Sequence, residues 1–358
     1  MTTRALTLTV SSALLALLVS VAFLVPVPYV TESPGLTADV LGNDISVDGQ
    51  ETDTPVITID GDVESYPTSG ELLLTTVSVT NPDSRVTLLQ AFGAWFDEED
   101  ALLPRDVVYP PDQTPDEARE ETAVAMTGSQ STSEVAAAVA AGYEVTATAG
   151  VAEVLPEGPS DGRLEVDDQI LAVDGEPVAG SEEVVESVRA AAPGEPLGLV
   201  VRRDNSRQVV DVVPVADDGR TTIGVSVGDS YSVPFDVEFN LERDIGGPSA
   251  GTIFALAIYD KLTPGDLTGG EVVAGTGEMF YDGTVGPIGG IQQKLVSSVE
   301  DGASVFLAPA DNCDDALQAP VEPGEIQIVR IGTLDEAIDA LEALAEDPDA
   351  DVPTCEAT

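Results

Sequence analysis

Hydrophobic residues are concentrated in one long run at the start of the chain. After Arg4, residues 5–25 are apolar apart from Thr and Ser, and two prolines close the run. At a helical rise of about 1.5 Å per residue, this run spans roughly 31 Å, the thickness of a hydrocarbon core. We expect residues 1–30 to be a cytoplasmic N-terminus and a single-pass anchor in the cell membrane, with the bulk of the chain extracytoplasmic, because Arg4 favours the inner side. The alternative is a signal peptide cleaved near Ser20-Val21-Ala22.

The pattern then changes to shorter elements. Residues 31–142 are expected to be rich in strands, and the apolar, β-branched stretch 70–80 is the clearest of them. Residues 104–121 are rich in Pro, Asp and Glu and indicate an exposed connection. An Ala-rich helix is predicted over 131–141, with Ser133 as its N-cap.

Residues 143–215 carry a pattern of their own, with short apolar strands, one amphipathic helix over 181–190 and Gly-containing turns between them. The text EGPSDGRLEVDDQILAVDGEPV resembles the core signature of bacterial PDZ domains, except that Asp167 stands where the family usually has Gly. This resemblance implies binding of a peptide as an added strand, with its carboxylate held by a backbone loop. By position, that peptide-binding loop is Gly142, Tyr143 and Val145, although an Ala-Gly-Tyr sequence is equally typical of a helix end.

Charge and composition limit the chemistry. The chain has 14 basic and 65 acidic residues and a net charge of −51, a field that repels nucleic acid and anionic lipid headgroups. It has no histidine, which excludes a His base and His-ligated metal sites. Neither of its lysines, Lys261 and Lys294, lies in a GxxxxGK[ST] phosphate loop. An acid–base mechanism would therefore use carboxylates, Lys, Tyr, Cys or a terminal amine.

A glycine-rich turn before an apolar helix presents one candidate nucleophile, Ser249. The sequence Asp244-Ile-Gly-Gly-Pro-Ser-Ala-Gly251 follows a strand pattern and precedes a helix over 252–259. First-turn N–H groups and the helix dipole can stabilise an oxyanion, so we expect the backbone around Gly247, Pro248 and Ala250 to serve that purpose. A simple N-cap serine in a turn is the structural alternative.

The candidate base is Lys294, which lies in the predicted helix after Gly289-Gly290. Its neighbours Ile291, Leu295 and Val296 are apolar. A desolvated lysine has a lowered pKa and can deprotonate a serine hydroxyl as the neutral amine. A surface lysine whose stem packs on apolar residues is the alternative.

Together, the texts GGPSAG, GTGEMFYDGTVGPIGGIQQKL and GASVFLAPADN resemble the proteolytic domain of the Lon family of serine peptidases, over about 115 residues from Phe235. The resemblance implies that Ser249 is the nucleophile, that Lys294 is its base and that Thr276 positions the lysine. The same segment around Thr276 also reads as a plain hairpin that turns at Asp282-Gly283.

The resemblance extends upstream, to GELLLTTVSV and MTGSQSTSEVAAAVAAGY. It therefore suggests a PDZ module inserted into the proteolytic domain. The expected fold is α+β, with a PDZ domain over 143–215, a Lon-type proteolytic domain over 225–345 and a tail over 346–358. Full-length Lon has an ATPase module, for which we see no phosphate loop here.

We therefore expect an ATP-independent serine endopeptidase that acts on extracytoplasmic or membrane-associated peptides and proteins, with no metal or organic cofactor. Lon-type domains often form rings, so a homo-oligomer is a further partner to consider. The alternatives are an inert PDZ peptide-binding scaffold and an amidase or esterase that uses the same dyad. Cys313 and Cys355 are expected to form a disulfide in an oxidising compartment, and two free buried thiols are the alternative.

Overall fold

A computed structural model describes residues 3–45, 51–203, 206–217, 219–241 and 245–356. The chain folds into two compact units, and the first is built from two separate stretches of sequence, Met1–Gly142 and Phe235–Thr358. The second unit is Tyr143–Pro234, which lies between those stretches along the chain.

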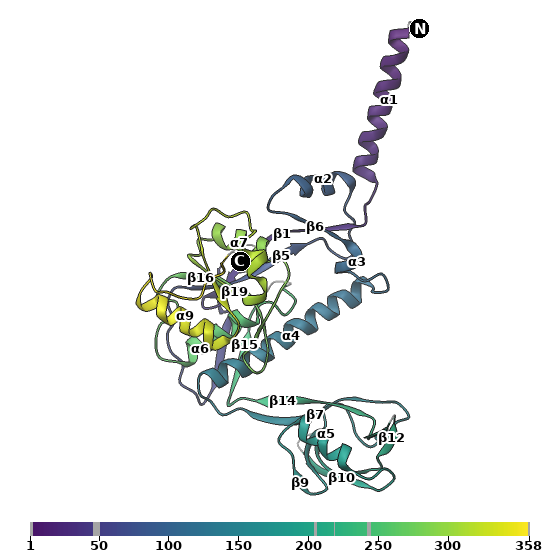
Figure 1. The fold of residues 1–358 in the computed structure, drawn as a ribbon, viewed down its shortest axis with the longest axis vertical. Helices are drawn as coiled ribbons and strands as arrows, with labels where there is room; N and C mark the ends of the chain where they lie inside the picture. Colours follow the sequence, from purple (N-terminus) through teal and green to yellow (C-terminus); the bar gives the residue numbers. More distant parts are fainter. Residues whose placement is uncertain (1–2, 46–50, 204–205, 218, 242–244, 357–358) are drawn as a thin grey trace. The chain divides into compact units, whose positions relative to one another are not determined.

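The first unit begins with helix α1 (Thr3–Leu24), drawn in purple in Figure 1. Its apolar part, Leu6–Leu24, has a mean hydropathy of 2.2, and none of it is buried inside the protein. It is long and apolar enough to cross a membrane, and a signal sequence passes the same test.

A mixed sheet forms the centre of the first unit, in the strand order β20-β19-β16-β5-β1-β6. Figure 1 labels five of these strands: β1, β5, β6, β16 and β19. The first four strands pair in parallel, and β1 pairs antiparallel with β5 and β6. The predicted strand 70–80 is β5, and it lies beside β16 in the middle of this sheet. The bounds are β1 (Tyr29–Asp39), β5 (Glu71–Val79), β6 (Ala101–Pro104), β16 (Val272–Gly275), β19 (Val305–Pro309) and β20 (Gln327–Ile331).

Helices pack on both faces of this sheet because its central strands are apolar at successive positions. Leu73, Ala274 and Phe306 share one cluster with Ile291 and Leu295 of α7 (Ile291–Glu300). On the opposite face, α6 (Gly251–Leu262) comes so close to β16 that a Cβ at Gly275 would lie 2.9 Å from the Ile253 side chain. The remaining helices of the unit are α2 (Leu88–Phe96), α3 (Arg105–Val108), α4 (Pro115–Ala140), α8 (Cys313–Ala316) and α9 (Leu334–Glu346), with a 3-10 turn at Ala310–Asn312.

Short two-stranded pairs complete the unit. Strand β4 (Ile57–Gly61) pairs antiparallel with β15 (Phe235–Phe239), which joins the two stretches of sequence. The other pairs are β2 (Asn43–Ile45) with β3 (Glu51–Pro55), and β17 (Glu278–Met279) with β18 (Val285–Gly286).

Helix α4 corrects two predictions. The segment 104–121 is not one exposed connection, because α3 occupies Arg105–Val108 and α4 begins at Pro115. Thr114 caps α4 in a capping box with Glu117, and Pro115 takes the first helical position. Ser133 is consequently not an N-cap; it is fully buried in the last third of a 26-residue helix.

The second unit is a sheet in the order β11-β10-β8-β7-β14, with β9 paired to β8 and helix α5 (Ser181–Ala190) packed against it. Its core is aliphatic and includes Ile170, Leu199 and Val201. Strand β14 belongs to this sheet, so the predicted start of the proteolytic domain at 225 is wrong and the boundary moves to Phe235. The strands are β7 (Thr146–Val154), β8 (Gln169–Val173), β9 (Glu176–Pro177), β10 (Leu197–Arg203), β11 (Ser206–Val212), β12 (Val215–Asp217), β13 (Arg220–Thr222) and β14 (Val225–Ser232).

The position of Asp167 has a simple local explanation. Its φ is 70°, in the left-handed region that favours glycine, in the turn just before β8. An Asp tolerates this conformation better than most side chains, so the sequence departs from the usual glycine while the turn is kept.

Candidate active site

The serine turn is held against helix α4, which sequence reasoning did not connect with it. The Gly247 N–H donates to the Thr122 carbonyl at 3.0 Å, and the Ser129 hydroxyl donates to the Pro248 carbonyl at 3.0 Å. Ser133 donates to the Gly251 carbonyl at 2.8 Å. One main-chain carbonyl and two serine hydroxyls of the same helix therefore fix the backbone on both sides of Ser249.

Close packing explains two of the glycines in this turn. A Cβ at Gly246 would lie 2.2 Å from the Thr122 side chain, and one at Gly251 would lie 2.8 Å from Met279. Neither contact leaves room for a side chain. Ser249 itself is partly exposed and stands two residues before the first residue of α6.

Lys294 comes from helix α7 and points into the interior. The helix begins after Gly290, whose φ is 67° and whose Cα is so close to Val77 that a Cβ would lie 2.5 Å from a methyl group. This contact presses the start of α7 onto β5. Lys294 is only 2% exposed.

The lysine amine meets the serine hydroxyl at the end of β16. Lys294 Nζ lies 2.8 Å from Ser249 Oγ, 2.9 Å from Thr276 Oγ1 and 3.1 Å from the Thr75 carbonyl. Burial lowers the pKa of Lys294 from its ordinary value to about 7, because the charged amine loses its water. The amine is therefore ready to exchange a proton with the hydroxyl near neutral pH.

Thr276 holds this arrangement together. It follows β16 directly, is fully buried, and accepts from Lys294 Nζ while donating its own hydroxyl to the Ser249 carbonyl at 3.0 Å. The next residue, Gly277, donates its N–H to the same carbonyl at 2.9 Å. One threonine thus contacts both the candidate base and the backbone of the candidate nucleophile.

The predicted oxyanion donors need a correction. Pro248 has no N–H, and the Gly247 N–H is already bonded to Thr122, so neither is available to a substrate. Among the backbone hydrogen bonds of the described residues, none uses the N–H of Ser249 or Ala250. These two groups, next to the start of α6, are therefore the candidate oxyanion donors of the turn.

The segment after Thr276 forms a hairpin, as predicted, from β17 and β18. Strands β17 and β18 pair antiparallel, and the turn between them includes Gly283 at φ 81°. Phe280 and Tyr281 at its tip are 44% and 38% exposed. The turn is anchored to the start of α9, where the Leu334 N–H donates to the Gly283 carbonyl at 2.8 Å.

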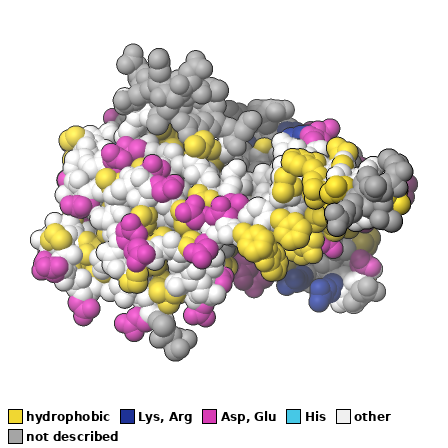
Figure 2. All heavy atoms as spheres, turned by 90° about the horizontal axis from the view of Figure 1, so that it is seen from above, with side chains coloured by type: hydrophobic (Ala, Val, Ile, Leu, Met, Phe, Trp, Pro, Cys, Tyr) yellow, Lys and Arg dark blue, Asp and Glu magenta, His cyan; other side chains and the backbone are white. Residues whose placement is uncertain are grey.

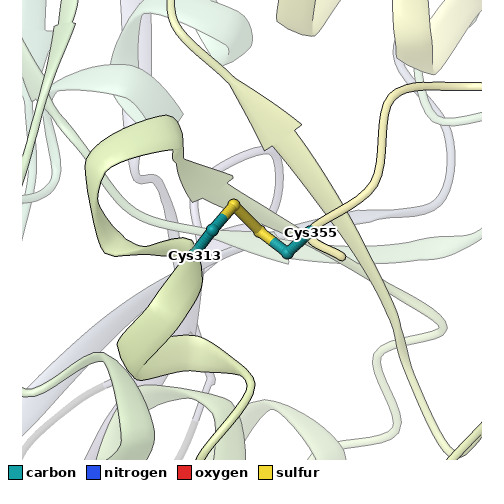
Figure 3. Close-up of a disulfide and its surroundings, with 2 residues drawn as sticks. All are labelled: Cys313 and Cys355. Carbon is teal, nitrogen blue, oxygen red and sulfur yellow. A yellow bond between two sulfur atoms is a disulfide. The ribbon is translucent and has the colours of Figure 1, made fainter. Parts of the chain in front are cut away.

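The two cysteines are joined in a disulfide, with their Cα atoms 5.2 Å apart (Figure 3). Cys313 begins α8, and Cys355 lies in the C-terminal tail next to β20, where its N–H donates to the Ile328 carbonyl at 3.1 Å. The bond ties the tail to the apolar cluster under α7.

The predicted peptide-binding loop, Gly142, Tyr143 and Val145, runs from the end of α4 to the start of the second unit. Gly142 has φ 81° and donates its N–H to the Val139 carbonyl, so it ends helix α4. The predicted loop leads into β7, which pairs with β14 on one side and with β8 on the other. Strand β14 is at the end of the sheet order, and α5 packs beside it.

Comparison with known proteins gives independent evidence for both units. Residues 243–344 match the family model of the Lon protease (S16) C-terminal proteolytic domain. This chain contains a Lon-type proteolytic domain. Residues 125–213 match the PDZ domain model, although α4 runs through Ala140 and the compact unit starts at Tyr143.

Individual relatives agree with this assignment. The chain is 38% identical over 93 residues to Lon protease 1 of Sorangium cellulosum, which covers 26% of this chain and 11% of that protein. It is 34% identical over 131 residues to a Lon protease of Campylobacter concisus, covering 36% and 16%, and 28% identical over 198 residues to one of Rhizobium meliloti, covering 49% and 22%. The matches thus span about a tenth to a fifth of these relatives.

Among solved structures, the chain is similar to the PDZ domain of an SdrC-like protein of Listeria monocytogenes. The identity is 21%, the match covers 22% of this chain and 85% of that one, and the TM-score is 0.21. The assignment of the Lon-type domain rests on the family model and on the Lon protease relatives. Such a domain is a serine-type peptidase domain.

Proposed function

We propose that this protein is an ATP-independent serine endopeptidase in which Ser249 is the nucleophile and Lys294 is the general base. The observation that carries the proposal is the 2.8 Å contact between Lys294 Nζ and Ser249 Oγ. A lysine that is 2% exposed, with a pKa of about 7, is neutral in a large fraction of molecules at neutral pH. Only that neutral form has a lone pair to accept the hydroxyl proton.

The contacts of Lys294 suggest how the proton moves. As Ser249 Oγ attacks the scissile carbonyl carbon, Lys294 Nζ takes the hydroxyl proton and becomes an ammonium group. The Thr276 hydroxyl and the Thr75 carbonyl accept hydrogen bonds from that ammonium group and hold it in place. Lys294 then returns the proton to the leaving amine, which releases the first product and leaves an acyl-serine for water to hydrolyse.

Two backbone groups support the charged intermediate in this proposal. The N–H groups of Ser249 and Ala250 point from the start of α6, where the helix dipole is positive. An oxyanion formed on the attacked carbonyl binds there without a positively charged side chain.

The substrate class follows from the rest of the chain. With α1 in a membrane, the catalytic unit acts outside the cytoplasm, on peptides and proteins in or near the membrane. Without an ATP-driven unfolding step, we expect flexible or extended segments to be cleaved and stable globular domains to be spared. The PDZ unit recruits or gates such segments by adding them as a strand to the outer edge of β14, beside α5.

The test is cleavage of unstructured proteins by the full chain in detergent micelles, without ATP, followed by mass spectrometry. The expected result is internal cleavage by the wild type and none by Ser249→Ala or Lys294→Met. Ester and peptide probes compared side by side separate an endopeptidase from an esterase or amidase.

An inert peptide-binding scaffold gives the opposite result. Folded wild-type protein would then cleave nothing, even after peptides that bind the PDZ unit are added. Val227→Pro removes a backbone N–H from β14, and reduced peptide binding with intact cleavage of short peptides is expected for that variant.

A further inference from the structure

The large apolar side chains of helix α2 face outward, whereas in a helix of a soluble domain they would face the core. Its buried residues are the small Ala91 and Ala94, whereas its large ones face outward. Phe92 is 54% exposed, Trp95 72% and Phe96 79%. The Phe92 and Phe96 rings stack with their centroids 6.5 Å apart and extend this apolar face. A surface of this kind marks a binding site for an apolar partner.

The position of α2 indicates which partner. Its first N–H, on Leu88, donates to the Val25 carbonyl at 3.2 Å, and the Val27 N–H donates to the Val86 carbonyl at 2.9 Å. Residues 25–27 directly follow the apolar span of α1, so α2 starts where that span ends. If α1 crosses a bilayer, α2 lies at the level of its headgroups.

Figure 2 looks down on the molecule from the side of α1. Hydrophobic side chains gather in one patch on the side where α1 and α2 lie, whereas acidic side chains are scattered over the rest of this face. Arg85, just before α2, is exposed, and among the described residues its guanidinium has no ion pair. In a chain of net charge −51, an unpaired arginine beside an apolar face suits a lipid phosphate group.

We propose that α2 is a second membrane contact, an interfacial helix that places Phe92, Trp95 and Phe96 at the boundary between headgroups and acyl chains. This proposal rests on the proposed insertion of α1 in a membrane. Aromatic side chains are favoured at that depth because one part of the ring system is apolar and the region is partly wet. The contact holds the proteolytic domain against the bilayer, so that it reaches segments that emerge from or run along the membrane surface.

The chain carries its own probe, because Trp95 is its one tryptophan. The experiment uses the full chain in phosphatidylcholine vesicles, made with and without lipids that are brominated near the headgroup end of the acyl chain. We expect blue-shifted Trp95 emission and quenching by the brominated lipid of about two-fold or more, with little quenching by aqueous acrylamide. Trp95 emission that acrylamide quenches fully and brominated lipid leaves unchanged would overturn the proposal.

A matched control moves the probe to another part of the same unit. Leu317 at the end of α8 is 40% exposed, so a Trp95→Phe, Leu317→Trp variant should be quenched by acrylamide and not by brominated lipid. Equal lipid quenching at both positions would also overturn the proposal. So would protection of Trp95 in detergent that disappears on dilution of the protein, because it would assign this face to a second copy of the chain.

Separate measurements distinguish the membrane contact of α2 from the membrane insertion of α1 and from the peptidase activity. Flotation of the chain with the vesicles reports on α1, and quenching of Trp95 reports on α2. Ser249→Ala should give the same quenching as the wild type, since the spectroscopic signal does not depend on peptidase activity. A chain that floats and cleaves but leaves Trp95 in water would refute the α2 contact alone.

Discussion

The two lysines of this chain, Lys261 and Lys294, lie in regions that change the pKa of the amine to different extents. Lys261, at the C-terminal end of α6, is partly buried, and burial lowers its pKa while the nearby Asp260 and Asp39 raise it. Lys294, in α7, is buried more completely, and burial alone lowers its pKa to about 7. Burial still lowers the pKa of Lys261, but two nearby carboxylates oppose that change, whereas at Lys294 no nearby charge opposes it. The comparison indicates that Lys294 can act as a base because it is buried without a neighbouring carboxylate.

The largest effect is expected when the amine of each lysine is removed in turn. We expect Lys294→Met to lower kcat/KM for a peptide by about 10³-fold or more, because the attacking hydroxyl loses its base. Lys261→Met should leave kcat/KM essentially unchanged, since the charged neighbours of Lys261 are Asp260 and Asp39, whereas the serine hydroxyl is bonded by Lys294. Peptide cleavage is measured at one pH, with circular dichroism to show that both variants fold. Equal losses in the two variants would refute the assigned roles.

The next largest effect is expected at Thr276, whose hydroxyl accepts a hydrogen bond from Lys294. Thr276→Val removes the hydroxyl that accepts from Nζ and donates to the Ser249 carbonyl, so we expect kcat/KM to fall by about 10²-fold through misplacement. The variant also loses an acceptor for the charged amine, so the midpoint of its pH profile should move to lower pH.

Thr276→Ser keeps both hydrogen bonds and is the control for that variant. It should restore most of the activity and the original midpoint. A Thr276→Val enzyme with the wild-type midpoint and only lowered thermal stability would make the residue a structural one.

The pH dependence of cleavage is the third test. The protonated amine cannot act as a base, so kcat/KM should rise about ten-fold per pH unit below pH 7 and level off above it. The measurement is initial rate at low substrate concentration, on a peptide without ionisable side chains. A profile that is flat or falls with pH across this range would exclude Lys294 as the base.

The smallest effect is on stability, and its sign follows from linkage. The folded-state pKa of Lys294 is about 7 and lies below the unfolded value, so between pH 7 and about 10 the unfolded chain binds more protons. Stability from this group therefore increases with pH in that window, by at most about 1.4 kcal/mol per unit, and the cost is fully present below pH 7. Burial raises the pKa of Asp260 to about 6, so its contribution has the opposite sign, between about pH 4 and 6.

The difference between wild type and Lys294→Met isolates the lysine from the many other carboxylates. Urea unfolding at pH 7, 8 and 9 should show the stability advantage of the methionine variant shrinking as the pH increases. An advantage that is constant over this range would place the pKa of Lys294 outside it.

Some features were readable in the sequence because they are local. The glycine turn before an apolar helix predicts Ser249 as a candidate, and the apolar helix after two glycines predicts Lys294; the match with a Lon proteolytic domain model covers both positions. The start of α4 also has a local sequence signal, because Thr114 and Glu117 form a capping box around Pro115. High charge in that segment suggested a loop, although it only marks an exposed first turn.

Other features could not be read because they depend on residues far apart in the chain. Thr122, Ser129 and Ser133 bond the serine turn across more than a hundred residues, and the carbonyl of Thr75 meets Lys294 across 219 positions. A serine or threonine in a helix has the same sequence pattern whether its hydroxyl faces its own backbone or another element. The choice of β14 as the outer strand of the PDZ sheet is likewise a matter of pairing between distant segments.

The sequence by itself determined the residue types of the chemistry: a serine at a helix start, a lysine among apolar neighbours, and no histidine to replace it. Only the tertiary structure decided that the amine meets the hydroxyl, and that the Gly247 N–H is already bonded to the Thr122 carbonyl. The physical reason is that a pKa and an unpaired N–H are properties of surroundings. Lys294 is buried beside Thr276 because α7 packs on β5 and Thr276 follows β16 directly, and the residues near Lys294 encode neither arrangement.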